Sequence, residues 1–267
     1  MACNEMYRIR HRVFSSPYLA LVVALVFIAP TANATARDTI WGDLLKTYVS
    51  TPSDGINRFD YRNVSPSDHE KLATYLENMQ RLDPGKMGDA EQRAYWINPY
   101  NALTVKVVLE HFPVESIRNI RSGLFSIGPS DKKIVRVDGE YLSLNNIEHD
   151  ILRTRWNNNR IHYALNCASL GCPNLQPEPF SAEKLDKQLD EAAQAYVNHP
   201  RGATIHNGKL TISSIYKWYA EDFGNSDALV IKHIASFATS VKASQLKNIS
   251  KIDTYEYDWT LNAPDSN

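Results

Sequence analysis

The chain has 267 residues, of which 43% are hydrophobic and 22% charged, and its net charge is −1. This apolar content excludes a disordered chain, because disordered chains have too few apolar side chains to form a core. The near-neutral charge and the lack of a basic run exclude a dedicated nucleic-acid binder, whose affinity depends on clustered Lys and Arg side chains. We therefore expect a globular protein that does not bind nucleic acid.

Residues 1–34 have the pattern of a secretory signal peptide. Three arginines precede an apolar run over residues 19–29, and the small residues Ala32 and Ala34 mark a cleavage site. The run is shorter than the roughly 20 residues that span a bilayer. We expect an exported protein, periplasmic or extracellular, that contacts the membrane only through an uncleaved signal peptide. Cleavage removes three arginines and Glu5, which changes the net charge from −1 to −3.

Helix signals dominate residues 35–267, which we interpret as a single domain. Ser65-Pro66 is typical of a helix start, with serine as the N-cap and proline in the first turn. Asn98-Pro99 predicts a bend or a restart within a long apolar helix. The expected helices cover residues 38–50, 66–79, 89–111, 144–156, 182–198, 214–223 and 226–238.

Strand signals are fewer than helix signals. Asp138-Gly139 and Asn207-Gly208 are hairpin turn signals, each between two short strand patterns. Ile161–Asn166 is apolar enough for a buried strand, and Lys251–Tyr257 is suited to a last one. Helices and hairpins occur in clusters without regular βαβ alternation. The predicted class is therefore α+β: a mostly helical single domain with small antiparallel β-hairpins.

Candidate chemistry centres on Cys167 and Cys172, which remain when Cys3 leaves with the signal peptide. In an oxidising compartment such a pair suggests first a disulfide. A thiol nucleophile needs a base or a positive charge nearby, but side chains alternate along a strand, so His162 and Cys167 would face opposite sides. A disulfide, a reactive thiol and a metal site with His162 all stay open here. The spacing matches no zinc pattern, and we expect neither a metal nor a cofactor.

Two of the expected helices carry polar side chains in apolar surroundings. Glu148 falls inside the apolar arc of the helix after Ser143, and His149 lies on its flank. A carboxylate directed at a core must be paired, hydrogen-bonded or protonated. Glu148 is thus either a buried structural partner or an acid/base group that orients a histidine. Asn98 and Asn101 in the long apolar helix either cap a neighbouring loop or donate to a developing oxyanion.

Four stretches of the sequence resemble, in order, the family called domain of unknown function 547. They are Tyr95–Leu103 (YWINPYNAL), Leu142–Arg153 (LSLNNIEHDILR), His162–Pro173 (HYALNCASLGCP) and Tyr257–Asn262 (YDWTLN). The resemblance is strongest over residues 90–262 and implies an exported bacterial member of a family without a settled activity. By this resemblance, His162 and Cys167 match the family's HxAxxC segment, and Glu148-His149 matches its IEH segment.

The leading hypothesis is a thiol-dependent hydrolase or acyl/amide transferase with Cys167 as its nucleophile. Its parts are similar to those of papain-like and transglutaminase-like folds. The groups that would serve as base, orienter and oxyanion donors are His149, His162, Glu148, Asn98 and Asn101.

Two other functions compete with this hypothesis. One is a non-catalytic binding module for a small molecule, a peptide or a protein, stapled by a disulfide between Cys167 and Cys172. The other is a redox role, which ranks third because the thiols are not in a CxxC arrangement.

We expect signal cleavage to leave a protein that begins at Thr35. Mass spectrometry of the exported fraction should give the mass of residues 35–267. The substitution Ala34→Leu should block cleavage, because the residue before the cut must be small. Exported wild-type protein that still carries residues 1–34 would contradict the prediction.

Overall fold

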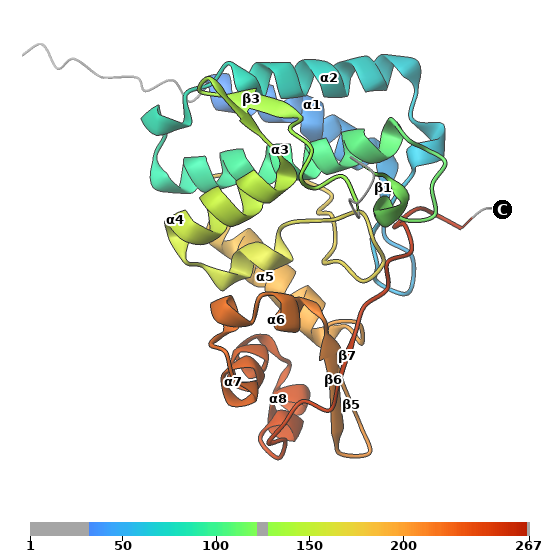
Figure 1. The fold of residues 1–267 in the computed structure, drawn as a ribbon, viewed down its shortest axis with the longest axis vertical. Coiled ribbons are helices and arrows are strands. Elements are labelled where there is room, and N and C mark those ends of the chain that lie inside the picture. The colour runs from blue at the N-terminus through green and yellow to red at the C-terminus, as the bar shows by residue number, and fades with distance from the viewer. Residues whose placement is uncertain (1–31, 122–127, 266–267) are drawn as a thin grey trace, which may run out of the picture.

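The computed structural model describes residues 32–121 and 128–265. The signal peptide expected over residues 1–34 lies outside the described residues, except for its last three. Within the described ranges, no helix combines the length and the apolarity that a membrane span requires. Helices dominate and the strands form three small sheets, which confirms the predicted α+β class (Figure 1).

The upper part of the molecule in Figure 1 is a group of helices around α3 (Asp89–Leu109). Both α1 (Ala32–Tyr48) and α2 (Pro66–Gln80) precede it, and α2 packs against the other two. The start of α2 is as predicted: the Ser65 side chain accepts a hydrogen bond from the N–H of Asp68, and proline is the first helical residue. The cap thus satisfies one of the N–H groups that a helix start leaves without a partner.

The long helix α3 continues through Pro99 without a restart, so of the two alternatives expected at Asn98-Pro99 the restart is wrong. A proline inside a helix removes one backbone hydrogen bond and costs roughly 3 kcal/mol. Nearly all residues from Tyr95 to Leu109 are buried, so packing against neighbouring elements keeps this part of the chain helical. Asn98 is therefore not a helix cap, and its amide is available to another segment.

The helix expected after Ser143 has an unusual form. Its first part, Asn146–Arg153 (η4), is a π-helix, and Thr154–Trp156 (α4) continues it as an α-helix. The Ser143 hydroxyl accepts the N–H of Asn146 and thereby caps the start, as the sequence predicts. A π-helix is rare and is found mostly at functional sites, which directs attention to the polar residues of this helix.

The main correction concerns Ile161–Asn166, expected as a buried strand. The segment is buried, but Asn159–Tyr163 (η5) forms a 3₁₀-helix and the residues after it are irregular. Its polar groups are satisfied by turns and by the side chain of Asn101 instead of a neighbouring strand. A short apolar run does not by itself distinguish a strand from a helical turn. The alternation that separated His162 from Cys167 on two faces therefore does not apply.

The lower part of the molecule contains a three-stranded sheet in the order β5–β6–β7 (Figure 1). The strands β5 (Ala203–His206) and β6 (Lys209–Ser213) form the predicted hairpin, and the backbone at Asn207-Gly208 has the positive φ angles that its turn requires. The last strand, β7 (Thr254–Glu256), pairs with β6 in parallel, whereas only antiparallel pairs were expected. Helices of this part are α5 (Leu185–Asn198), α6 (Ile215–Trp218), α7 (Asp227–Phe237) and α8 (Ser240–Leu246).

The remaining elements are short. The predicted hairpin at Asp138-Gly139 is present, and a second pair of strands joins two segments near the N-terminal end of the described chain. These strands are β1 (Val49–Ser50), β2 (Arg58–Phe59), β3 (Val135–Val137) and β4 (Glu140–Leu142). The short 3₁₀-helices are η1 (Tyr61–Asn63), η2 (Pro84–Lys86), η3 (Ile117–Asn119) and η6 (Ala220–Phe223).

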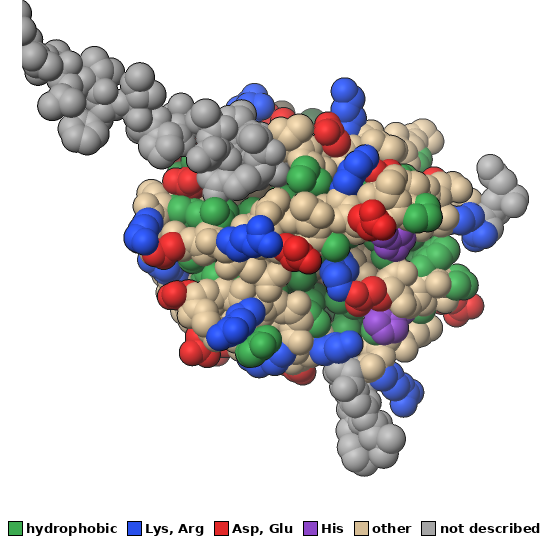
Figure 2. Space-filling model, turned by 90° about the horizontal axis from the view of Figure 1, so that it is seen from above, with side chains coloured by type: hydrophobic (Ala, Val, Ile, Leu, Met, Phe, Trp, Pro, Cys, Tyr) green, Lys and Arg blue, Asp and Glu red, His purple; other side chains and the backbone are tan. Residues whose placement is uncertain are grey.

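Two apolar cores meet along α5. Leu185 and Leu189 belong to the core of α1–α3, whereas Ala192 and Ala193, one to two turns on, belong to the core of the sheet and α6–α8. Residues 164–173, which we call the thiol loop, follow η5 at this junction. On the face seen from above, acidic and basic side chains alternate and form no patch of one sign (Figure 2).

Gly171 lies where the thiol loop passes against the C-terminal segment of the chain. A Cβ atom at this position would lie 2.7 Å from the backbone nitrogen of Asp258. We expect Gly171→Ala to lower the free energy of unfolding by about 1–3 kcal/mol, because one of the two segments must move. As a control, Gly42→Ala in α1 brings its Cβ no closer than 3.4 Å to Pro179 and should be neutral or stabilising. Equal unfolding temperatures for the two variants would contradict the close approach.

Candidate functional site

The thiol loop is held by side-chain amides. Asn101 of α3 donates from Nδ2 to the carbonyl of Ala164 (2.9 Å) and accepts the N–H of Asn166 at Oδ1 (2.8 Å). Asn166 in turn accepts the N–H of Ala168 (2.9 Å) and donates to the carbonyl of Pro173 (2.7 Å). Ala168 has a φ of +57°, a left-handed conformation that turns the chain sharply after Cys167. The loop is thereby fixed although it lacks regular secondary structure.

The C-terminal segment closes the other side of the thiol loop. The N–H groups of Leu170 and Gly171 donate to the carbonyls of Thr260 and Asp258, both at 2.8 Å. The backbone N–H of Asn262 donates to the carbonyl of Ala168 at 3.2 Å. Segments about 90 residues apart in sequence thus pair across the loop, and this contact brings Tyr257 to the cysteines.

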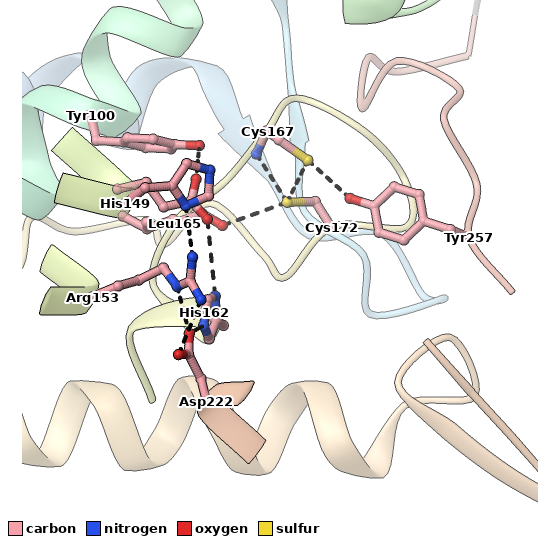
Figure 3. Close-up of polar contacts among 10 residues, drawn as sticks. Tyr100, His149, Arg153, His162, Leu165, Cys167, Cys172, Asp222 and Tyr257 are labelled. Carbon is pink, nitrogen blue, oxygen red and sulfur yellow. Dashed lines mark hydrogen bonds and ion pairs between the residues drawn. The ribbon is translucent and has the colours of Figure 1, made fainter. Parts of the chain in front are cut away.

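The two cysteine sulfurs lie 2.9 Å apart (Figure 3). Both cysteines are free thiols in the structure. The Sγ atom of Cys167 also lies 2.9 Å from the hydroxyl of Tyr257 and 3.3 Å from that of Ser169. The Sγ atom of Cys172 accepts the backbone N–H of Cys167 at 2.9 Å and lies 3.5 Å from the carbonyl oxygen of Leu165. The sulfur of Cys167 is thus surrounded by groups that can donate a hydrogen bond to a thiolate.

The surroundings of the two sulfurs are unequal. Cys172 is buried, with 3% of its surface exposed, whereas Cys167 is partly exposed. The hydrogen bond between the two sulfurs lowers the pKa of Cys167, with further help from Ser169 and Tyr257 and against the effect of burial. Burial raises the pKa of Cys172 well above the ordinary value. Cys167 is therefore the thiol that ionises first, and Cys172 the one that keeps its proton.

A second polar cluster lies beside the thiols, on and around the π-helix. Glu148 is buried as expected, and one of its carboxylate oxygens accepts the hydroxyl of Tyr100 at 2.9 Å. The other oxygen lies 4.0 Å from Nδ1 of His162, whose Nε2 is 2.6 Å from Asp222 Oδ2. The His162 ring stacks on the ring of Tyr219. Both ring nitrogens of this buried histidine therefore face carboxylates.

Arg153 completes this polar cluster on its exposed side. It donates two hydrogen bonds to the carboxylate of Asp222, at 2.6 and 3.1 Å, and its Nη1 lies 3.0 Å from Nδ1 of His149. Burial opposes the charge on Asp222, yet the hydrogen bonds from His162 and Arg153 hold the pKa of that carboxyl well below its usual value. The π-helix thus supplies Glu148, His149 and Arg153 to one connected network, and Figure 3 shows the last two of these side chains beside His162 and Asp222.

The structure places the six predicted site residues in three environments. Cys167 lies in the thiol loop, while Glu148, His149 and His162 lie in the polar cluster. Within the part of the chain that the structure describes, no histidine is among the hydrogen-bond partners of Cys167. The amides of Asn98 and Asn101 each hold a backbone segment: Asn98 donates to and accepts from Phe180, and Asn101 holds the thiol loop.

Three residues of the site were missed in the sequence. Tyr257 and Ser169 contact the sulfur of Cys167, and each lies within a stretch that carries the family resemblance. Their place in these two stretches was the one signal in the sequence that pointed to them. Asp222 lies in a short helix without a distinctive pattern, so nothing in the sequence connected it with His162.

A metal site is not formed by the described residues. No group of three or more His, Cys, Asp or Glu side chains in residues 32–121 and 128–265 is arranged to hold a metal ion. The carboxylates of the polar cluster are instead satisfied by Tyr100, His162 and Arg153.

The fold and the site define an α+β domain with a pair of thiols at the junction of two cores. Residues 84–197 match the family model described as "Protein of unknown function, DUF547", which supports the resemblance found in the sequence. The matched range contains three of the four stretches that suggested it, and the stretch Tyr257–Asn262 lies beyond it. Comparison with curated proteins and with solved structures gave no match.

Asp222 provides a test of the polar cluster through the pH dependence of stability. Because its pKa is lowered on folding, the ionised carboxylate stabilises the protein above its ordinary pKa of about 4, and this stabilisation is lost as the pH falls below that value. We expect Asp222→Asn to lower the free energy of unfolding by about 1–3 kcal/mol at pH 7. The difference from wild type should narrow below about pH 4.

The matched control for this prediction is Asp186→Asn. Asp186 also pairs with an arginine, at 2.8 Å, but its side chain is 71% exposed, so the change should be within about 0.5 kcal/mol. Denaturant unfolding at several pH values measures both variants. A constant difference between wild type and Asp222→Asn from pH 3 to 7 would refute the role of the ionised carboxylate.

Proposed function

We propose that this domain carries out thiol–disulfide exchange, with Cys167 as the attacking thiol and Cys172 as the resolving thiol. The observation that carries the proposal is the 2.9 Å contact between a partly exposed and a buried sulfur. The five-residue spacing in sequence argued against a redox pair. The left-handed backbone at Ala168 removes that objection, because it folds the loop back and brings the sulfurs together.

The reaction follows the ordinary course of thiol–disulfide exchange. The Cys167 thiolate attacks a substrate disulfide, a mixed disulfide forms, and the released substrate sulfur takes up a proton. Cys172 then loses its proton to solvent and attacks the sulfur of Cys167, which releases the second substrate thiol. The pair ends as a Cys167–Cys172 disulfide, two electrons pass to the substrate, and a dithiol reductant restores the thiols. The same steps in reverse oxidise a substrate dithiol.

The unequal pKa values of the two thiols support these roles. An attacking thiol must be ionised and accessible, and the partners of Cys167 lower its pKa. A resolving thiol is best protonated until the mixed disulfide forms, and burial raises the pKa of Cys172. Tyr257 keeps its proton because burial raises its pKa well above 10. Its hydroxyl is therefore a donor to the Cys167 thiolate at neutral pH.

A thiol-dependent hydrolase or acyl/amide transferase is the second candidate. It is favoured by the same lowered pKa of Cys167 and by the Tyr257 hydroxyl, a possible proton donor to a leaving group. It requires a base, and the polar cluster of Glu148, His162 and Asp222 would have to supply one from outside the contacts of the sulfur. A binding module stapled by a Cys167–Cys172 disulfide is the non-catalytic alternative. All three functions suit an exported protein in an oxidising compartment.

A test with the two single cysteine variants separates these functions. With hydroxyethyl disulfide as substrate, we expect wild-type protein to end with a Cys167–Cys172 disulfide, and Cys172→Ser to stop at a mixed disulfide on Cys167. Peptide mapping under non-reducing conditions identifies each product. Cys167→Ser should form neither product. Iodoacetamide should alkylate Cys167 before Cys172, with an apparent pKa below the free value of about 8.5.

Other outcomes of the same test point to the other functions. If Cys172→Ser hydrolyses thioesters through an acyl group on Cys167, the protein is a hydrolase or acyl transferase. If the wild-type cysteines are fully bonded after purification and do not react with a dithiol until the protein is unfolded, the stapled module is the better description. Either result contradicts thiol–disulfide exchange.

A further inference from the structure

Four aromatic side chains border the thiol pair. Tyr255, Tyr257 and Trp259 occupy alternate positions of the C-terminal segment, so they share one face of an extended chain. Trp218 of α6 packs against two of them, with ring centroids 4.8 Å from Tyr257 and 5.4 Å from Trp259. Trp218 is 47% exposed, whereas Tyr255 and Tyr257 pack against the core of the sheet and α6–α8, Trp259 packs against the core of α1–α3, and each of these three keeps only part of its surface exposed. We call these four residues the aromatic strip.

The aromatic strip is continuous with the reactive sulfur. The Tyr257 ring lies 4.6 Å from that of Trp259, while its hydroxyl lies 2.9 Å from Cys167 Sγ. A molecule that covers the strip therefore reaches the thiol. Exposed Trp and Tyr side chains beside a functional group are typical of binding surfaces, because they bury much area at little entropic cost.

The same segment forms the end of a sheet. The strand β7 has β6 on one side and is the last strand of its sheet. Such an edge leaves backbone groups that can pair with an added strand. Residues 254–259 span about 18 Å at the usual rise of a strand. An edge strand, an aromatic face and a thiol thus follow one another along one extended segment.

The charged side chains along this segment do not form a binding site for a small charged ligand. The exposed acids Glu256 and Asp258 alternate with the aromatic residues. Lys217 lies over the ring of Tyr255, and Arg118 over that of Trp259. Because both signs are present in equal number, a small disulfide whose recognition depends on its charges finds no complementary patch. Recognition is left to the backbone edge and the aromatic rings.

We infer that the substrate of the thiol pair is an extended polypeptide whose cysteine is flanked by apolar side chains, bound along residues 254–259. The inference rests on the proposed thiol–disulfide exchange and adds its substrate class. An added strand meets the edge of β7, its apolar side chains cover the aromatic strip, and its cysteine lies at Cys167. A polypeptide is the ligand class that uses all three features together.

The rate of exchange tests the inference. The substrates are two synthetic pentapeptides with a central cysteine blocked as a mixed disulfide with mercaptoethanol, one with Leu and Phe flanks and one with Ser and Gly flanks. Hydroxyethyl disulfide is the reference. We expect the apolar peptide to react at least 10-fold faster than the polar one. Trp218→Ala should abolish this preference, measured as the ratio of the two peptide rates within the same variant.

The matched control is Tyr141→Ala, which removes another exposed aromatic side chain, on β4 and 62% exposed; it should leave all three rates unchanged. A methylated backbone at alternate residues of the apolar peptide should slow its reaction, because it blocks pairing with β7. Equal rates for the two peptides with wild-type protein would overturn the inference and leave the exchange reaction standing. An unchanged ratio of the two peptide rates in Trp218→Ala would also overturn it, because the aromatic strip would then not contribute to recognition.

A binding measurement with a peptide that cannot react distinguishes a wrong substrate class from a wrong reaction. The apolar peptide with serine in place of cysteine should quench tryptophan fluorescence of Cys167→Ser, and the added change Trp218→Ala should weaken that binding at least 10-fold. If this binding is observed while no disulfide reacts, the peptide site stands and the proposed exchange fails. Absence of binding overturns the inference.

Discussion

The side-chain amide of Asn101 is the interaction on which the site depends. It reaches from a buried helix and satisfies a carbonyl and an N–H of the thiol loop, as a neighbouring strand otherwise would. Unpaired backbone groups in a protein interior cost about 1–3 kcal/mol each, so an irregular buried loop needs such partners. Asn166 and Asn262 extend the same arrangement to the turn after Cys167 and to the C-terminal segment. The position of the sulfur follows from this series of amides.

The chemical inequality of the two cysteines follows from the same geometry. The turn at Ala168 directs Cys167 toward the surface and Tyr257, while Cys172 remains under the loop. Hydrogen bonds favour the charged form of the first sulfur, and burial favours the neutral form of the second. The polar cluster on the π-helix lies close enough for the charge of Glu148 to oppose the thiolate.

Much of the fold is predictable from the sequence, because local signals and tertiary structure agree. Ser65-Pro66 begins a helix, and the two hairpin turns occur where the Asp-Gly and Asn-Gly pairs predict them. The segment Ile161–Asn166 was predicted wrongly, since its conformation depends on an amide that is about 63 residues away in sequence. The parallel pairing of β7 depends likewise on contacts distant in sequence.

The candidate site could likewise be predicted only in part from the sequence. Cys167, Glu148 and the asparagines were recognisable as polar or reactive groups in apolar segments. Their partners were not, because Asp222 and Tyr257 lie on elements that are 60 and 90 residues away in sequence from His162 and Cys167, respectively. Sequence periodicity reports which face of an element is buried, but it does not report what lies opposite that face.

The pairing of the thiol loop with residues 258–262 also sets an order of events during folding. The last partner of the loop is synthesised about 90 residues after the cysteines. Until it arrives, both sulfurs lack the hydroxyl of Tyr257 and the backbone contacts that separate their environments. A chain whose C-terminal segment has not yet docked therefore lacks one of the hydrogen bonds that lower the pKa of Cys167, and the site is complete only after that segment is in place.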